Sequence, residues 1–184
     1  MRRFLKAFIA LAAITFTAAA YADPPGRVGR VNYSQGQVSF APGEAPDQWV
    51  QVPLNRPLTA GDRLWADTGS VAELHVGSTA LHIGQQTSMD VLNLDDHTAQ
   101  FRVTQGALVV RVRALADRDV MEIDTPNEAA SILRAGLYRV DVTEAGDVST
   151  VTVREGEADV AAGTTAFPLR RDRSRRDRRS SADS

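Results

Sequence analysis

The chain has 184 residues and no cysteine, which excludes disulfides, thiolate metal sites and thiol nucleophiles. Its formal charge of -2 conceals an asymmetry, because residues 23–169 carry 11 Arg and 20 Asp or Glu, whereas residues 170–184 carry 7 Arg and 3 Asp. An acidic body repels phosphate backbones, so we do not expect nucleic acid as a partner. A chain of this length is typical of one domain and can bury a sizeable core without cross-links.

The first 22 residues have the parts of a cleavable secretory signal in the required order. Three basic side chains come first, residues 7–20 are apolar or small apart from two threonines, and Ala20-Tyr21-Ala22 supplies the small residues that a signal peptidase needs. The alternative is a membrane anchor, but the apolar run is shorter than the about 20 residues that span a bilayer. We therefore expect a bacterial periplasmic or secreted protein, cleaved near Ala22 and left without a transmembrane segment.

From Arg27 onward, apolar residues alternate with polar ones, and glycines interrupt the pattern. This period of two predicts β-strands, and no stretch of a dozen residues keeps helical spacing. Residues 127–133 could form one helical turn at most. We expect short strands near 28–40, 49–52 and 63–65, followed by strands at 71–76, 80–83, 89–94, 100–103, 107–112, 120–123, 137–142, 148–153 and 158–160. This pattern predicts an all-β domain over residues 23–169, with short antiparallel hairpins stacked as a β-solenoid-like or sandwich fold.

A short pattern of a strand, a polar residue with Gly, and a second strand recurs three times. The copies are centred on Gln35-Gly36, Gln105-Gly106 and Glu155-Gly156. Glycine at each break permits the positive φ that a tight reversal needs, so each copy predicts a hairpin.

Residues 170–184 contain no apolar side chain except Ala182, so we expect a disordered, Arg-rich tail that cannot join a core. Two interpretations of this tail stay open. It is either a basic arm that contacts an anionic lipid or polysaccharide surface, or an out-of-frame extension, since GC-rich coding favours Arg-rich strings.

The most suggestive catalytic motif is Asp67-Thr68-Gly69-Ser70, because Asp-Thr-Gly-Ser is the active-site turn of aspartic proteases. A protease needs two such carboxylates, and the chain has one copy, so this hypothesis would require a homodimer. The alternative is a β-turn in which Asp and Gly have conformational roles. We favour the turn and keep a dimeric aspartic protease that uses Asp67 as a remote alternative.

The three histidines are candidate metal ligands. His75 and His82 occupy equivalent places in two Gly-ended strands seven residues apart, and His97 follows two aspartates. A metal site would need a third ligand that the pattern does not supply. Alternation instead places Leu74 and Leu81 on the buried face, so we expect both histidines to face solvent.

No nucleophile-elbow serine and no phosphate-binding glycine loop is present in the sequence. The larger aromatic residues are too scattered for a sugar-binding platform, and we expect core or cross-strand roles for Trp49, Trp65, Phe40, Phe101 and Tyr138. We therefore predict no enzyme activity, no cofactor, and no catalytic or metal-binding residues. The predicted core includes Leu64, Leu74, Leu81, Val109 and Val140.

Two ordered stretches carry a resemblance to a known family. They are residues 57–65 with 69–74 and 79–84, and residues 123–127 with 134–140 and 153–156. Together they resemble the FecR domain, a β-rich extracytoplasmic module, over roughly residues 28–162. The family usually has Arg-Gly-Thr where this chain has Arg134-Ala135-Gly136, which is a departure.

The resemblance implies a role in contact between envelope proteins. The best-known FecR relatives join a cytoplasmic anti-sigma segment to a periplasmic domain that senses an outer-membrane receptor. Only six residues precede the apolar segment here, so we expect a secreted FecR-like protein without that cytoplasmic segment. The leading hypothesis is a β-domain that binds another cell-envelope protein, such as an outer-membrane receptor or a related signalling component, with β-augmentation at a strand edge as one mode. The alternative is a polysaccharide- or peptidoglycan-associated surface module.

Overall fold

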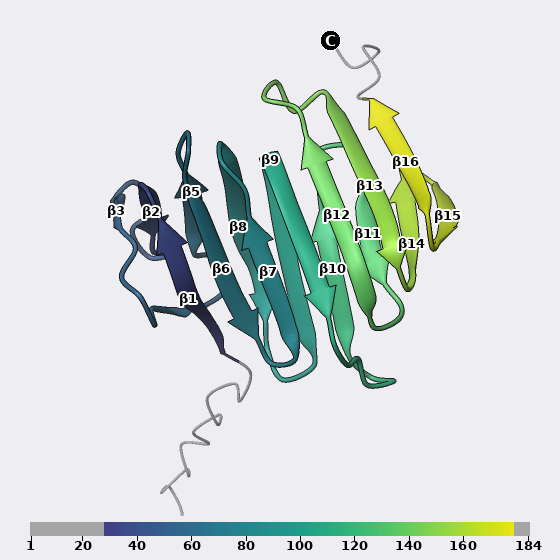
Figure 1. Ribbon diagram of the computed structural model, residues 1–184, viewed down its shortest axis with the longest axis horizontal. Helices are drawn as coiled ribbons and strands as arrows, with labels where there is room; N and C mark the ends of the chain where they lie inside the picture. The colour runs from purple at the N-terminus through teal and green to yellow at the C-terminus, as the bar shows by residue number, and fades with distance from the viewer. Residues whose placement is uncertain (1–27, 179–184) are drawn as a thin grey trace, which may run out of the picture.

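Residues 28–178 are described by a computed structural model, and this part of the chain contains sixteen β-strands and no helix (Figure 1). The prediction of an all-β fold is confirmed. The signal segment predicted for residues 1–22 lies outside the described residues. Between residues 28 and 178 there is accordingly no helix of the length and apolarity that a membrane crossing requires.

The strands are short, apart from β9, and follow one another closely. Their bounds are β1 Gly29–Gln35, β2 Val38–Ala41, β3 Val50–Gln51, β4 Pro57–Leu58, β5 Arg63–Ala66, β6 Val71–Val76, β7 Thr79–Ile83, β8 Thr87–Leu94, β9 Thr98–Val112, β10 Val120–Asp124, β11 Ala129–Ile132, β12 Gly136–Val142, β13 Val148–Glu155, β14 Glu157–Ala162, β15 Thr165–Arg170 and β16 Arg173–Arg178.

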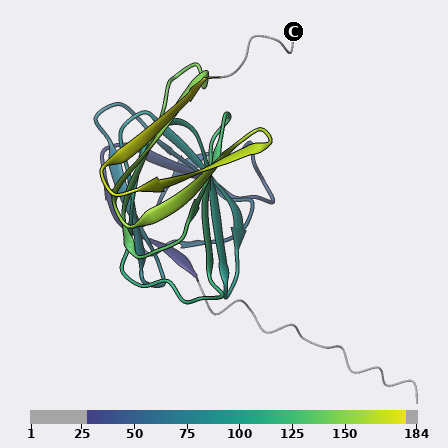
Figure 2. The same ribbon diagram turned by 90° about the vertical axis from the view of Figure 1, so that its right-hand side faces the viewer.

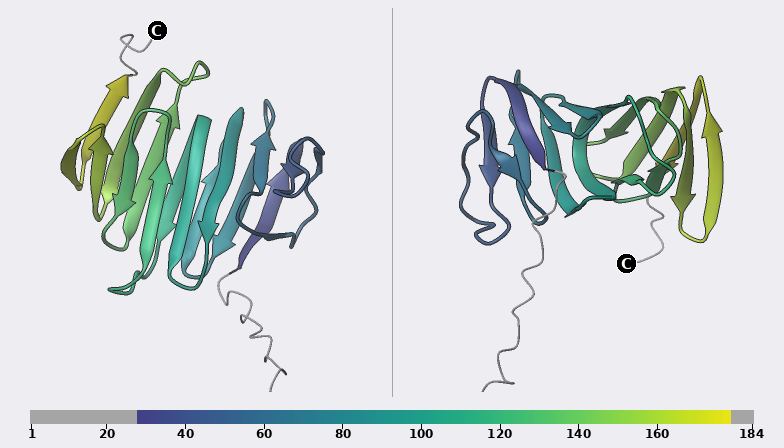
Figure 3. Two further views of the ribbon diagram at one scale, coloured as in Figure 1. Left: turned by 180° about the vertical axis from the view of Figure 1, so that it is seen from behind. Right: turned by 90° about the horizontal axis from the view of Figure 1, so that it is seen from below.

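Two facing layers of strands are visible when the molecule is viewed along its length (Figure 2) and from below (Figure 3, right). Sheet A has the order β4-β1-β6-β7-β9-β12-β13-β16. Sheet B has the order β3-β2-β5-β8-β9-β10-β11-β14-β15. The long strand β9 belongs to both sheets, with its first half in sheet B and its second half in sheet A. The chain thus advances along the long axis while it alternates between the layers, in agreement with the predicted stack.

One strand pair departs from the predicted antiparallel pattern. Strand β10 runs parallel to the first half of β9, from Val120 opposite Thr98 to Asp124 opposite Arg102. The reason is topological, because the chain leaves the end of β9 in sheet A and crosses to sheet B before β10 begins.

The three repeated glycines mark corners between the sheets, so the prediction of hairpins at these positions is wrong. Gly36, Gly106 and Gly156 have φ values of +80°, +93° and +96°. At Gly36 the chain leaves β1, which pairs with β4 and β6, and enters β2, which pairs with β3 and β5. A positive φ redirects the chain equally well into a hairpin or across to the opposite layer.

Each corner glycine packs against a buried hydroxyl group. A Cβ at these positions would lie 2.4 Å from Ser70 Oγ, 2.3 Å from Thr87 Oγ1 and 2.1 Å from the Tyr138 oxygen, respectively. The same oxygens accept the backbone N–H of the residue after each glycine: Gln37 to Ser70 (2.8 Å), Ala107 to Thr87 (2.9 Å) and Glu157 to Tyr138 (3.1 Å). The corners therefore share one arrangement. The absence of a side chain on Gly leaves room for a hydroxyl group, and the hydroxyl oxygen accepts the backbone N–H of the next residue.

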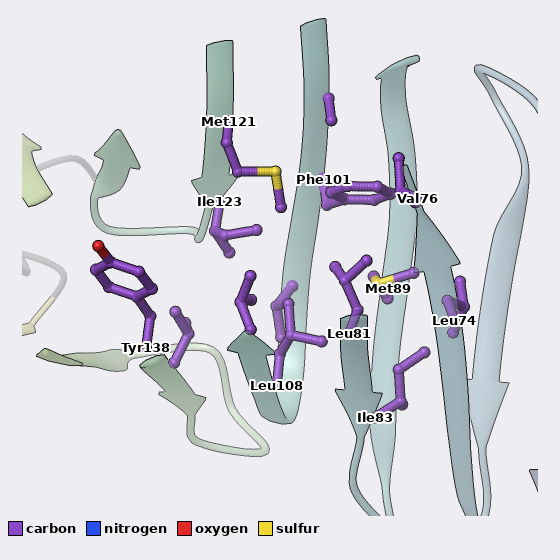
Figure 4. Packing of buried hydrophobic residues seen from close by; sticks show 14 of the residues in the cluster. Leu74, Val76, Leu81, Ile83, Met89, Phe101, Leu108, Met121, Ile123 and Tyr138 are labelled. Atoms are coloured by element: carbon purple, nitrogen blue, oxygen red, sulfur yellow. The ribbon is translucent and has the colours of Figure 1, made fainter. Parts of the chain in front are cut away.

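The core lies between the two sheets (Figure 4). Four of the five predicted core residues are buried, namely Leu64, Leu74, Leu81 and Val140. The prediction for Val109 is wrong, since Leu108 and Val110 point into the core and Val109 lies half-buried on the outer face of sheet A. The run of apolar residues in β9 left its buried face ambiguous in the sequence.

Two further predictions of local structure are corrected. Ala129–Ile132, within the possible helical turn at residues 127–133, form strand β11 between β10 and β14. Arg173–Arg178, predicted as part of a disordered tail, form strand β16 against β13. This segment needs no apolar side chain to join the sheet, because β13 offers a free row of backbone donors and acceptors. The Arg175 guanidinium also stacks 3.7 Å from the centroid of the Phe167 ring.

Candidate functional site

The outer face of sheet A carries an uninterrupted row of side chains across seven strands. Cross-strand register places neighbours opposite one another in the order Tyr33, Glu73, His82, Val109, Arg139, Thr152, Ser174. A second row beside it contains Ala107, Asp141, Thr150 and Arg176. The two rows together are called face A below.

Face A is hollowed along its middle. Gly84 and Ala107 present little or no side chain there, and the Gly84 N–H donates to the Ala107 carbonyl at 2.9 Å. Two cavities of about 770 Å³ and 320 Å³ share these two residues and Arg139. The small residues thus leave a groove that runs from β6 and β7 across β9 towards β13 and β16.

One end of the groove is apolar. The exposed fractions of Tyr33 and Val71 are 50% and 39%, and Val109 lies half-buried between them and Arg139. The Tyr33 hydroxyl donates to Gln35 Oε1 at 2.8 Å, which holds the ring on the sheet. This end of the groove therefore presents neighbouring apolar side chains to the surface.

The centre of the groove is charged. Arg139 Nε lies 2.7 Å from Asp141 Oδ2, and Arg139 Nη2 lies 2.5 Å from Asp141 Oδ1. The hydrogen bonds from Arg139 to the Asp141 carboxylate raise the pKa of the guanidinium. This bidentate pair holds a fixed array of donors and acceptors beside the apolar end.

Two of the three candidate histidines, His75 and His82, lie on sheet A, where they flank the carboxylate of Glu73. His75 Nε2 lies 2.5 Å from Glu73 Oε1, and His82 Nδ1 lies 3.4 Å from Glu73 Oε2. The prediction that both face solvent is confirmed by side-chain exposures of 41% and 46%. Sequence reasoning missed Glu73 as their shared partner, although alternation places it on the same face as His75. Within residues 28–178, no group of three or more His, Asp or Glu side chains is arranged to hold a metal ion.

His97 lies apart from these two histidines. Its Nδ1 is 3.4 Å from Asp119 Oδ1, and Asp95 Oδ1 accepts the backbone N–H groups of His97 and Thr98 at 2.8 and 2.7 Å. The hydrogen bonds from these two N–H groups lower the pKa of the Asp95 carboxyl. This arrangement turns the chain between β8 and β9.

The Asp67-Thr68-Gly69-Ser70 motif forms the turn between β5 and β6. The Ser70 N–H donates to the Asp67 carbonyl at 3.0 Å, and Gly69 has a φ of +71°. Asp67 Oδ1 accepts the Thr68 N–H at 2.7 Å within the same turn. Each residue of the motif thus has a conformational role, and Ser70 supplies the hydroxyl at the first glycine corner.

A buried acidic side chain lies under β16. Glu128 has no exposed side-chain surface, and its Oε2 lies 3.7 Å from Arg175 Nε. Burial is the main cause that raises the pKa of Glu128 to about 7; Asp177 adds to the rise and Arg175 opposes it. Sequence reasoning missed this residue, because the segment around it was not expected to be covered by the tail.

The aromatic residues divide into two groups. Phe40, Phe101 and Tyr138 belong to the core, as predicted. Trp49 and Trp65, which are separated in the sequence, instead line one depression on the outer face of sheet B. The loop before β3 brings Trp49 beside the neighbouring strands.

Comparisons with known proteins agree with this architecture. The model of the FecR protein family matches residues 62–159. Two crystal structures of a proposed anti-sigma factor from Parabacteroides distasonis, at 2.50 and 1.65 Å resolution, superpose with a TM-score of 0.55 each and identities of 14% and 13%. Each alignment covers 62% of this chain and 53% of the other, so the likeness spans about half of those proteins. No curated protein matches in sequence.

Proposed function

The chain belongs to the FecR family, and from this we propose that it is a non-enzymatic β-domain that binds another cell-envelope protein in the periplasm or outside the cell. Family membership supports a signalling or regulatory role. The N-terminal pattern of a secretory signal supports the location. We further propose that residues 23–169 act as one binding module.

The observation that carries this proposal is the groove of face A. Its apolar end, with Tyr33, Val71 and Val109, is bordered by the Glu73–His82 pair and by the Arg139–Asp141 pair. Protein interfaces have this composition, with an apolar centre inside a polar rim. The groove is open and crosses several strands, which suits a protein segment or domain better than a small molecule enclosed in a pocket.

Docking on the face is favoured over β-augmentation at an edge. Sheet A ends at β4, which has two residues, and at β16, which carries four arginines. Sheet B ends at β3, which also has two residues, and at β15, which contains Pro168. Short strands, charges and proline are the features that protect sheet edges against added strands.

The test is capture of a partner from an envelope extract by the immobilised protein. Val109→Glu places a charge in the middle of the apolar end, where His82 and Arg139 lie opposite on the neighbouring strands. We expect this variant to lose the captured protein. Val120→Glu is the matched control, since Val120 is 49% exposed in sheet B.

Thermal unfolding of both variants shows whether they fold like the parent chain. Equal capture by a folded Val109→Glu variant and by the parent would contradict docking on face A. Capture that is lost equally in both variants would show an effect of the added charge that is not specific to face A, and would also contradict docking there.

A further inference from the structure

The outer face of sheet B carries the two tryptophans of the chain within one depression. Cross-strand register places one row of side chains in the order Gln51, Ser39, Trp65, Ser88, Gln105. Trp65 therefore has a serine on the strand at each side. Such short neighbours leave part of the indole uncovered, and Trp65 is half-buried.

The depression has a volume of about 450 Å³. It is lined by Ser39, Trp49, Trp65, Ser88, Thr104 and Gln105. A volume of this size lies within the range of about 300–1,000 Å³ that is typical of ligand sites.

Trp49 is held at the rim of this depression. The residue is 44% exposed, and the Arg63 guanidinium carbon lies 5.4 Å from the centroid of the Trp49 ring. Arg63 also donates a hydrogen bond to the Pro46 carbonyl in the loop that leads to Trp49. These contacts fix the second indole without filling the space beside Trp65, so the aromatic surface is in place before a ligand arrives.

The chemistry of the lining selects among ligands. It consists of two indoles, three hydroxyl groups and one carboxamide, and none of these six side chains is charged. No cation belongs to the lining, and the Arg63 guanidinium at the rim is already engaged by the Trp49 ring and the Pro46 carbonyl, so a polyanion has no free cation to pair with there. An apolar helix would bury the hydroxyls and the carboxamide without hydrogen-bond partners, which is unfavourable. A pyranose ring offers an apolar C–H face for an indole and hydroxyls around its edge for the polar side chains.

We propose that this depression binds a neutral glycan chain, with a sugar ring stacked on Trp65, a second contact at Trp49, and hydrogen bonds to Ser39, Ser88, Thr104 and Gln105. The site is on the opposite layer from face A, so it can hold a glycan while face A holds a protein. The inference does not depend on the proposed protein partner.

The test uses the intrinsic fluorescence of the protein, because all of its tryptophan signal comes from the two indoles of the site. The ligands are cellotriose, which has only hydroxyl groups, and tri-N-acetylchitotriose, which adds acetamido groups as in wall glycans. We expect a saturable change with at least one of them. A preference for the acetylated sugar assigns the site to amino-sugar glycans, and a preference for cellotriose assigns it to unsubstituted polysaccharide. No saturable change with either sugar would overturn the proposal.

Two variants test whether sugar binding takes place in the depression. Ser88→Arg fills the space beside Trp65 while both indoles remain, and Trp65→Ala removes the stacking surface. We expect each to weaken binding by about tenfold or more, measured by calorimetry. Thr152→Arg is the matched control on face A and should bind like the parent chain. Full affinity in a folded Ser88→Arg variant would place the sugar elsewhere and refute the site.

Discussion

The hydroxyl oxygen of Tyr138 occupies the place that a side chain at Gly156 would need, 2.1 Å from the position of a Cβ. The same hydroxyl donates to the Arg134 carbonyl at 2.6 Å and accepts the Glu157 N–H at 3.1 Å. It thus joins the segment before β12 to the corner between β13 and β14. Residues 134–140 and 153–156, which both belong to the second FecR-like stretch, are therefore in direct contact in the fold.

This contact predicts that Gly156→Ala is unusually destabilising. The variant forces a side chain into a φ of +96° and displaces the Tyr138 hydroxyl from its hydrogen bonds. We expect the free energy of unfolding to fall by about 3 kcal/mol, from about 1–2 kcal/mol of backbone strain and about 1–3 kcal/mol for the unpaired groups. Urea unfolding measures the change.

Gly163→Ala is the control for Gly156→Ala. Gly163 has a φ of +58°, and no atom lies within 4 Å of its Cβ position. Its variant should lose only the strain component, about 1 kcal/mol. Equal losses in the two variants would show that the Tyr138 contact contributes nothing.

The raised pKa of Glu128 predicts that the free energy of unfolding depends on pH. Because the pKa of Glu128 is raised to about 7 in the folded protein, folding favours its protonated form. Its contribution to stability is fully present below the ordinary pKa of about 4.5 and is lost as pH rises towards 7. The Glu128→Gln variant should therefore be more stable than the parent at pH 8, by about 2–3 kcal/mol, and similar to it at pH 4.

Urea unfolding of the two proteins at pH 4, 6 and 8 measures this effect. The ionisable groups that face Glu128 are Arg175 and Asp177 of β16. Glu144→Gln, on the exposed loop after β12, is the control and should leave the pH profile unchanged. The explanation fails if Glu128→Gln and the parent protein differ equally at all three pH values.

Strand β16 predicts a pattern of hydrogen exchange in β13. Amides of Val148–Val153 that pair with β16 should exchange slowly in the full chain and faster in a chain that ends at Arg170, because truncation removes their partners. Amides of β12 that pair with β9 provide the internal reference. Unchanged protection of β13 after truncation would show that residues 173–178 do not form the strand in solution.

Much of the fold could be predicted because its signals are local. Alternation of apolar and polar residues identified the strands and the buried faces of β5, β6, β7 and β12. Whether a glycine forms a hairpin turn or a corner between the two sheets could not be predicted, since a positive φ at Gly36 is compatible with both. The difference lies in distant hydroxyls such as Ser70, which are not evident from the neighbouring sequence.

The candidate sites were less predictable because they depend on register. Alternation placed His82 on the outer face, but only the pairing of β6 with β7 brings Glu73 beside it. Val109 resembled a core residue because β9 is apolar on both faces near its corner. Trp49 and Trp65 are separated in sequence, and the pairing of β2 with both β3 and β5 brings their segments to one side of sheet B.

The central claim is that this FecR-family domain acts by contact through face A. Its most direct test is a photo-crosslinking amino acid placed at position 109 in cells that produce the protein, with position 120 in sheet B as the reference. We predict one discrete adduct with a cell-envelope protein from position 109 and none from position 120. No adduct from position 109, or the same adduct from both positions, would contradict the account.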